Sequence, residues 1–283
     1  MSIAKQINIC RKFKILQPIK RSMSACGYCL KCNTMHTLPT TQHAKDQVNL
    51  LRLSLHSNIP PFTIERRGKM VGVLITKDLN GEERVLKAFA GAVNGKWGLD
   101  GWSPVVGGEG TSPNDLPKYL KIQSLQYKLH EEQNHLKIKI KKMQFEKEKT
   151  NDYALQKTLL ELDELVSYRR KLAISALDEI RQHQYVTNFR GETDLLQNVF
   201  ATSQEQDWKS MNSKRIAMPS GTGDCCATKL LADAARQNLH PISIAEIFIG
   251  DTSTKNEGEF YDACKERCQP VLGFMLCGIE EQK

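Results

Sequence analysis

Residues 219–250 read PSGTGDCCATKLLADAARQNLHPISIAEIFIG, a segment that predicts a helix followed by a strand. Two glycines, Gly221 and Gly223, precede an alanine- and leucine-rich run whose apolar residues recur at helical spacing. Residues 242–250, which follow, are rich in isoleucine, and this β-branched content predicts a buried strand. A helix that leads directly into a buried strand indicates an α/β fold.

The segments on either side extend the pattern. Residues 70–78 and 84–93 are apolar runs on either side of an Asn-Gly dipeptide, which predicts a β-hairpin. We expect an amphipathic helix at residues 40–56 and a last helix through residues 264–277. The order helix, hairpin, helix, strand, helix predicts a small α/β sandwich of two or three layers.

A long helical insert interrupts this sandwich. Residues 118–190 contain no glycine or proline, and their apolar residues recur at the spacing of a helical hairpin or coiled coil. The polar triplet Thr150-Asn151-Asp152 is the expected turn. We therefore expect a basic, cysteine-containing leader at 1–39, the first part of the α/β body at 40–113, the insert at 114–190, and the second part of the body at 191–283.

Composition narrows the class of protein. The 283 residues carry a formal net charge of +8, which favours anionic partners such as RNA but also suits many other proteins. No run of about 18 apolar residues occurs, so we expect no membrane span. The nine cysteines are odd in number and stand at short spacings, which indicates reduced thiols or metal ligands in a cytoplasmic protein rather than a disulfide framework.

Cysteines near two predicted helix starts form the first candidate site. Cys225, Cys264 and Cys268 lie where the helix dipole lowers the pKa of a thiol, and thiolates are good metal ligands. We predict that these three bind a structural zinc ion, with Cys226 or Asp224 as the nearest candidate for a fourth ligand. The alternative is that the cysteines are small core residues.

A second candidate site lies in the leader. Residues 26–36 read CGYCLKCNTMH, so that Cys26, Cys29, Cys32 and His36 stand at spacings that could hold one metal ion. The alternative is a flexible N-terminal segment with reduced thiols.

The predicted order of elements resembles the zinc nucleoside deaminase fold, with one ligand on the second helix and a cysteine pair on the third. Those enzymes place a proton-shuttling glutamate two residues after the first ligand and a proline before the pair. Here Ala227 and Ala263 stand at these positions, and the nearby carboxylate, Asp224, precedes Cys225. The resemblance therefore implies a deaminase-like scaffold with degenerate chemistry.

Five segments occur in a fixed order along the chain: GKMVGVLITKD at 68–78, LKAFAGAV at 86–93, NFRGETDLLQNVF at 188–200, residues 219–250 quoted above, and GEFYDACKERCQPVLGFMLCG at 258–278. Together they resemble the N-terminal accessory region of RluA-type RNA pseudouridine synthases. The resemblance implies an accessory region that binds RNA (tRNA or rRNA) or positions a synthase domain supplied by another chain. The catalytic aspartate of the family's H-R-L-D motif is absent, so whether the chain is itself an enzyme stays open.

The insert supplies the expected RNA contact. Lys137, Lys139, Lys141 and Lys142 form a dense basic stretch, and phosphate contact is the physical use of such a run. The alternative is a solvated helix face. A third interpretation of the whole chain is an interaction protein that dimerises through its coiled coil.

Overall fold

A computed structural model describes residues 24–57, 68–146, 152–211, 217–250, 252 and 254–281. The chain divides into two compact units. Unit 1 contains residues 1–112 and 183–283, and unit 2 contains residues 113–182. Residues 1–23, the first part of the expected leader, lie outside the described residues.

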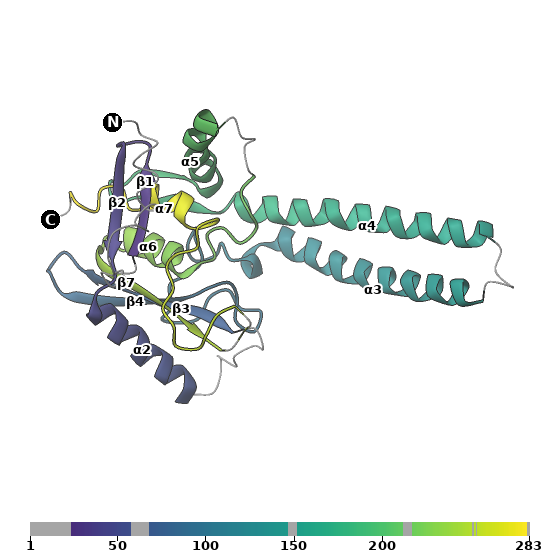
Figure 1. Cartoon of the computed structure of the whole chain (residues 1–283), viewed down its shortest axis with the longest axis horizontal. Helices are drawn as coiled ribbons and strands as arrows, with labels where there is room; N and C mark the ends of the chain where they lie inside the picture. The colour runs from purple at the N-terminus through teal and green to yellow at the C-terminus, as the bar shows by residue number, and fades with distance from the viewer. Residues whose placement is uncertain are drawn as a thin grey trace. The chain divides into compact units, whose positions relative to one another are not determined.

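A three-stranded antiparallel sheet forms the centre of unit 1 (Figure 1). Its strands are β3 (Lys69–Lys77), β4 (Glu83–Phe89) and β7 (His240–Ile249), in the order β4-β3-β7. The hairpin β3–β4 turns through Gly81, whose φ of 79° favours glycine, so the predicted hairpin is confirmed. The predicted mixed α/β class is confirmed as well.

Helices cover both faces of this sheet. Helix α2 (Gln42–Ser57) packs Ala44 and Val48 on one face, and α6 (Cys226–Arg236) packs its apolar side on the other. Side chains alternate along β7, so Ile244 faces α6 while its neighbour Ala245 faces α2. Strand β7 is therefore buried on both sides along most of its length, and its polar residues Ser243 and Glu246 lie inside the protein.

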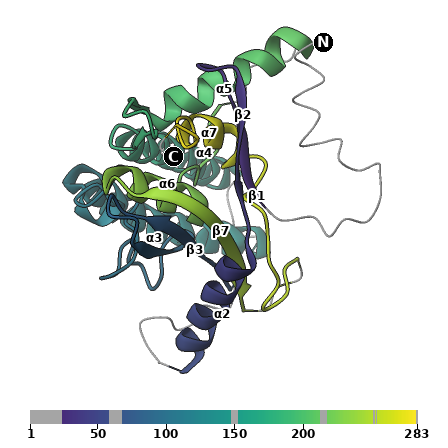
Figure 2. The ribbon, with the colours of Figure 1, turned by 90° about the vertical axis from the view of Figure 1, so that its left-hand side faces the viewer.

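The cysteine-containing hairpin β1–β2 lies against α7 (Gln269–Met275), as Figure 2 shows. Two glycines allow this contact: a Cβ on Gly27 would lie 2.2 Å from the backbone N of Gly273, and a Cβ on Gly273 would lie 2.1 Å from the carbonyl oxygen of Tyr28. Part of the expected leader is thus a folded hairpin of unit 1. The remaining elements of unit 1 are β1 (Ser24–Cys29), β2 (Thr34–Pro39), β5 (Tyr185–Thr187), β6 (Thr193–Leu195) and α5 (Leu196–Met211).

Unit 2 is a pair of antiparallel helices, α3 (Pro117–Phe145) and α4 (Asp152–Arg181), preceded by the short η1 (Pro113–Asp115). The predicted turn at residues 150–152 falls largely outside the described residues, although its Asp152 begins α4. Unit 2 ends at residue 182, before the expected boundary at 190, because β5 pairs with β6 in unit 1. Among the described residues, no helix is both long enough and apolar enough to cross a membrane.

Candidate metal centres

The structure brings Cys225, Cys264 and Cys268 together in what we call the three-thiol cluster. The Sγ atoms of Cys225 and Cys264 are 3.6 Å apart, and those of Cys264 and Cys268 are 3.3 Å apart. All three lie within 4.8 Å of one another and could hold a metal ion. A tetrahedral ion bound to sulfur at about 2.3 Å needs sulfur atoms about 3.8 Å apart, which is close to these separations.

Two helix starts build this cluster. Cys225 is the N-cap residue of α6 and has an extended backbone, and Gly221 and Gly223 before it turn the chain at positive φ. Cys268 is the N-cap residue of α7, and its backbone N–H donates to the carbonyl of Cys264. The cluster therefore forms where α6 and α7 begin, with Cys225 and Cys268 as the N-cap residues and Cys264 four residues before Cys268.

Neither expected fourth ligand joins the cluster. Cys226 is fully buried, and its thiol donates to the carbonyl oxygens of Met70 and Ala88, so it is a core residue. Asp224 is not among the grouped ligand atoms either. Within the part of the chain that the structure describes, three protein ligands are thus available, and the fourth position of a tetrahedral ion would have no protein ligand.

A glutamate that the sequence interpretation overlooked lies beside the three-thiol cluster. Glu246 is on β7, only 8% exposed, and its Oε1 accepts a hydrogen bond of 3.1 Å from the backbone N–H of Ala227. Gly72 lies opposite on β3, and a Cβ there would approach the Cγ of Glu246 to 3.1 Å. The carboxylate therefore reaches the start of α6 because the neighbouring strand has no side chain at that place.

Burial sets the charge state of this carboxyl group. Desolvation is the main cause that raises the pKa of Glu246 to about 7, with the hydrogen bond from Ala227 acting against it and the nearby Cys264 acting with it. A pKa near neutrality suits a group that must both take up and release a proton.

The three thiols of this cluster differ in how readily they lose a proton. Hydrogen bonding with Cys225 and Cys268 lowers the pKa of Cys264 to about 2. The same hydrogen bonds raise the pKa values of Cys225 and Cys268 above the ordinary thiol value. Cys264 is thus the thiolate of the metal-free cluster, and a cation would have to displace protons from the other two.

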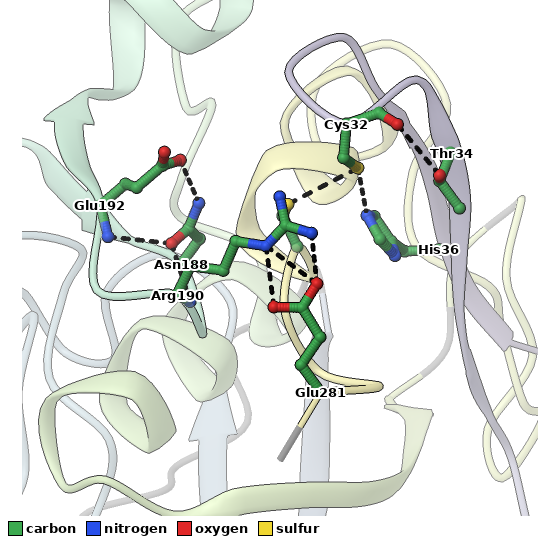
Figure 3. A network of polar contacts seen from close by, with 8 residues as sticks. Cys32, Thr34, His36, Asn188, Arg190, Glu192 and Glu281 are labelled. Carbon is green, nitrogen blue, oxygen red and sulfur yellow. Dashed lines mark hydrogen bonds and ion pairs between the residues drawn. The ribbon is translucent and has the colours of Figure 1, made fainter. Parts of the chain in front are cut away.

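A second group, which we call the four-ligand cluster, contains Cys29, Cys32, His36 and Cys277. Its four ligand atoms lie within 4.8 Å of one another. The Sγ of Cys32 is 3.1 Å from Nε2 of His36 and 3.7 Å from the Sγ of Cys277. Figure 3 shows the His36 ring turned toward Cys32.

The expected ligand Cys26 is not a member of this cluster. It pairs with Thr37 in the β1–β2 hairpin and stands three residues before Cys29, so the two side chains leave the strand on opposite faces. Its place is taken by Cys277, which the sequence analysis did not include in this site. The link between Cys32 and Cys277 spans 245 residues, and no local spacing signals it.

Two of the four ligands in this cluster, His36 and Cys32, have pKa shifts that suit metal binding. Burial lowers the pKa of His36, which keeps its imidazole neutral. Although desolvation opposes the change, hydrogen bonds from Cys277, Cys29 and Thr34 lower the pKa of Cys32. Burial raises the pKa of Cys277 to about 12. A neutral imidazole and a thiolate are the forms that bind metal ions.

A turn from another part of unit 1 fixes Cys277. The backbone N–H of Phe189 donates to the Cys277 carbonyl over 2.9 Å. Gly278, at a φ of 91°, leaves room for Arg190, because a Cβ there would lie 2.6 Å from the Cγ of Arg190. Arg190 pairs with Glu281 beside the cluster (Figure 3), and this hydrogen bond is the main cause that raises the pKa of Arg190.

The predicted RNA-contacting lysines lie on α3 of unit 2. Lys137, Lys139, Lys141 and Lys142 are all exposed. Exposure is compatible with phosphate contact and with a solvated helix face alike.

Comparison with known proteins identifies no relative. No family model matches the chain, and neither a curated protein nor a solved structure matches it. The proposals below therefore rest on the residues and their geometry.

Proposed function

We propose that this protein is a zinc-dependent hydrolase that replaces an exocyclic amine on a nitrogen heterocycle by oxygen and releases ammonia. The observation that carries the proposal is the pairing of three cysteine ligands with a buried carboxyl group, Glu246, beside them. Structural zinc sites are closed by four protein ligands, whereas catalytic sites use three and leave the fourth position for water or substrate.

The two clusters differ in solvent exposure, as expected for a closed structural site and an open catalytic site. Three members of the four-ligand cluster are buried and the fourth is half-buried. In the three-thiol cluster, Cys268 is buried, Cys225 is half-buried and Cys264 is exposed. The cluster that lacks a fourth protein ligand is therefore the one that faces solvent, as access by a substrate demands.

The roles of the residues follow from their positions. A zinc ion held by the three thiolates would supply Lewis acidity at the remaining position. Glu246 would accept a proton from the attacking water and pass it to the departing amine. The carbon gains a bond to oxygen and loses its bond to nitrogen, the nitrogen leaves as ammonia, and the reaction needs no oxidant or reductant.

The order of elements supports the deaminase comparison made from the sequence. Helix α2, the hairpin β3–β4, α6, β7 and α7 occur in this order in unit 1, with β5, β6 and α5 between β4 and α6. Two of the cysteine ligands, Cys225 and Cys268, are the N-cap residues of α6 and α7. Deaminases draw their catalytic glutamate from the helix itself, two residues after the first ligand. In this chain that residue is Ala227, and its N–H binds the carboxylate of Glu246. A carboxylate supplied by β7 would thus replace the one that the helix lacks.

Ammonia release tests this proposal. The zinc-loaded protein is incubated with cytidine, adenosine, guanosine and single-stranded RNA and DNA oligonucleotides, and ammonia is measured. We expect turnover of at least one of these that disappears on zinc removal, and a 10²- to 10⁴-fold lower kcat for Glu246→Gln. Glu82→Gln, in an exposed turn, is the matched control. The proposal fails if no compound releases ammonia or if Glu246→Gln keeps its full rate.

A second candidate function is RNA binding or positioning, which the exposed lysines of α3 and the resemblance to RluA-type synthases favour. Neutralising Lys137, Lys139, Lys141 and Lys142 to Gln should weaken RNA binding and reduce its salt dependence. Neutralising exposed lysines of α4 is the control. If both variants bind RNA equally well, the basic stretch of α3 is a solvated helix face that does not contact RNA.

A further inference from the structure

We propose that Cys29, Cys32, His36 and Cys277 bind a second zinc ion, which fixes the β1–β2 hairpin to α7 and thereby positions Cys268 of the three-thiol cluster. This structural centre uses ligands that the proposed hydrolysis does not use, and it acts on that site only through the position of Cys268. Three thiolates and one imidazole form one of the ligand sets that structural zinc uses.

The geometry fits a closed tetrahedral site. The separations of 3.7 Å between Cys32 and Cys277 and of 3.1 Å between Cys32 and His36 approach the edges of a tetrahedron with bonds of about 2.0 to 2.3 Å. A disulfide needs sulfur atoms about 2.05 Å apart, so the Cys32 and Cys277 thiols are not bonded to each other.

Histidine 36 points to a ligand rather than to a hydrogen-bonded core. The side chain is 4% exposed, and one ring nitrogen faces Cys32. The other, Nδ1, is buried and has no hydrogen-bond partner among the described residues. Among the described residues, Cys32 is thus the one hydrogen-bond partner of the ring, and Nε2 is the atom that the imidazole offers to an ion in the cluster.

The local chain is shaped to present these ligands. Cys29 ends β1, and the turn to β2 passes through Asn33, which adopts a φ of 56°. The hydroxyl of Thr34 then donates to the carbonyl of Cys32, which holds the turn (Figure 3). Across from it, the turn at Phe189 fixes Cys277 through its carbonyl. Ligands from both ends of the chain thus meet through backbone contacts that do not depend on the metal.

Helix α7 connects the two clusters. Cys268 is its N-cap, Cys277 follows two residues after its end, and its seven residues span only about 10 Å. At the contact between Gly27 and Gly273, the backbone of the β1–β2 hairpin packs directly on α7. An ion bound to Cys277 and to the hairpin would therefore hold α7, and with it Cys268, in place.

Zinc content per chain tests the inference. We expect two zinc ions in the wild-type protein, one in Cys32→Ser or Cys277→Ser, and two in the matched control Cys26→Ser, which alters the same hairpin outside the cluster. We also expect Cys32→Ser to weaken zinc binding by the three-thiol cluster about 10-fold, in the range seen for residues that orient ligands. Two ions retained in Cys32→Ser would overturn the inference.

Further outcomes separate this centre from the proposed hydrolase. A Cys225→Ser variant should keep the ion of the four-ligand cluster. If Cys225→Ser retains every ion while Cys32→Ser loses one, the structural centre stands and the hydrolase fails. If Cys32→Ser does not fold, alkylation of the zinc-loaded wild type decides: Cys29, Cys32 and Cys277 should resist modification until a chelator is added, and rapid modification of all three without chelator would contradict the inference.

Discussion

Removing the charge of Glu246 should change how stability depends on pH when the three-thiol cluster holds no metal. Burial raises the pKa of Glu246 from 4.5 to about 7. Because the folded protein then binds the proton more tightly than the unfolded chain, this group stabilises the fold fully below about pH 4.5, and the contribution is lost as pH rises to about 7. At about 1.4 kcal/mol for each tenfold change in affinity, the whole loss is about 3 kcal/mol.

The assay compares Glu246→Gln with its parent, both carrying Cys225→Ser to empty the cluster. Serine is a favoured N-cap residue, so this background should leave the start of α6 intact. Urea unfolding at pH 5 and at pH 8 should show the difference in unfolding free energy between the two proteins changing by about 2 to 3 kcal/mol in favour of Gln at the higher pH. When Cys225 is restored and zinc is bound, the difference in unfolding free energy should change less between pH 5 and pH 8, because a cation stabilises the ionised carboxylate. A difference that stays constant across this pH range would refute the assignment of a buried, desolvated carboxyl group.

Three further predictions concern the scaffold. Gly273→Ala places a Cβ 2.1 Å from the carbonyl oxygen of Tyr28, so it should lower the unfolding free energy by about 1 to 3 kcal/mol, whereas an unchanged thermal melt would contradict the close contact of the hairpin. Lys229→Met removes a buried ammonium that donates to two backbone carbonyls over 3.0 Å, which should cost about 2 kcal/mol or more in urea unfolding; a neutral result would mean that the carbonyls find other partners. Replacing residues 113–182 by a short glycine linker should leave unit 1 with a cooperative thermal transition, and loss of cooperativity would show that unit 2 belongs to the core.

Local signals predicted most of unit 1's central sheet. The Asn-Gly dipeptide between apolar runs gave the hairpin β3–β4, and the β-branched run gave β7, because both depend on nearest neighbours along the chain. Cys225, Cys264 and Cys268 could be grouped because Cys225 and Cys268 begin helices and Cys264 precedes Cys268 by four residues.

Tertiary contacts account for the residues that the sequence interpretation overlooked. Glu246 was a detectable signal, since it is a single carboxylate within an apolar strand, but its partner Ala227 became evident only once α6 was placed on the sheet. Cys277 meets Cys32 across 245 residues, a pairing that no spacing rule contains. The hairpin β1–β2 looked like a leader because its strands are short and gain their stability from the glycine contact with α7.

The most direct test of the catalytic site is the position of bound zinc in crystals of the zinc-loaded protein, found by anomalous diffraction at the zinc absorption edge. The account predicts a peak within about 2.3 Å of the Sγ atoms of Cys225, Cys264 and Cys268, with a water molecule as fourth ligand and the Glu246 carboxylate within hydrogen-bond distance of that water. A peak at the three thiols whose fourth ligand is Glu246 itself would describe a closed structural site and would contradict the proposed hydrolase, as would the absence of any peak there.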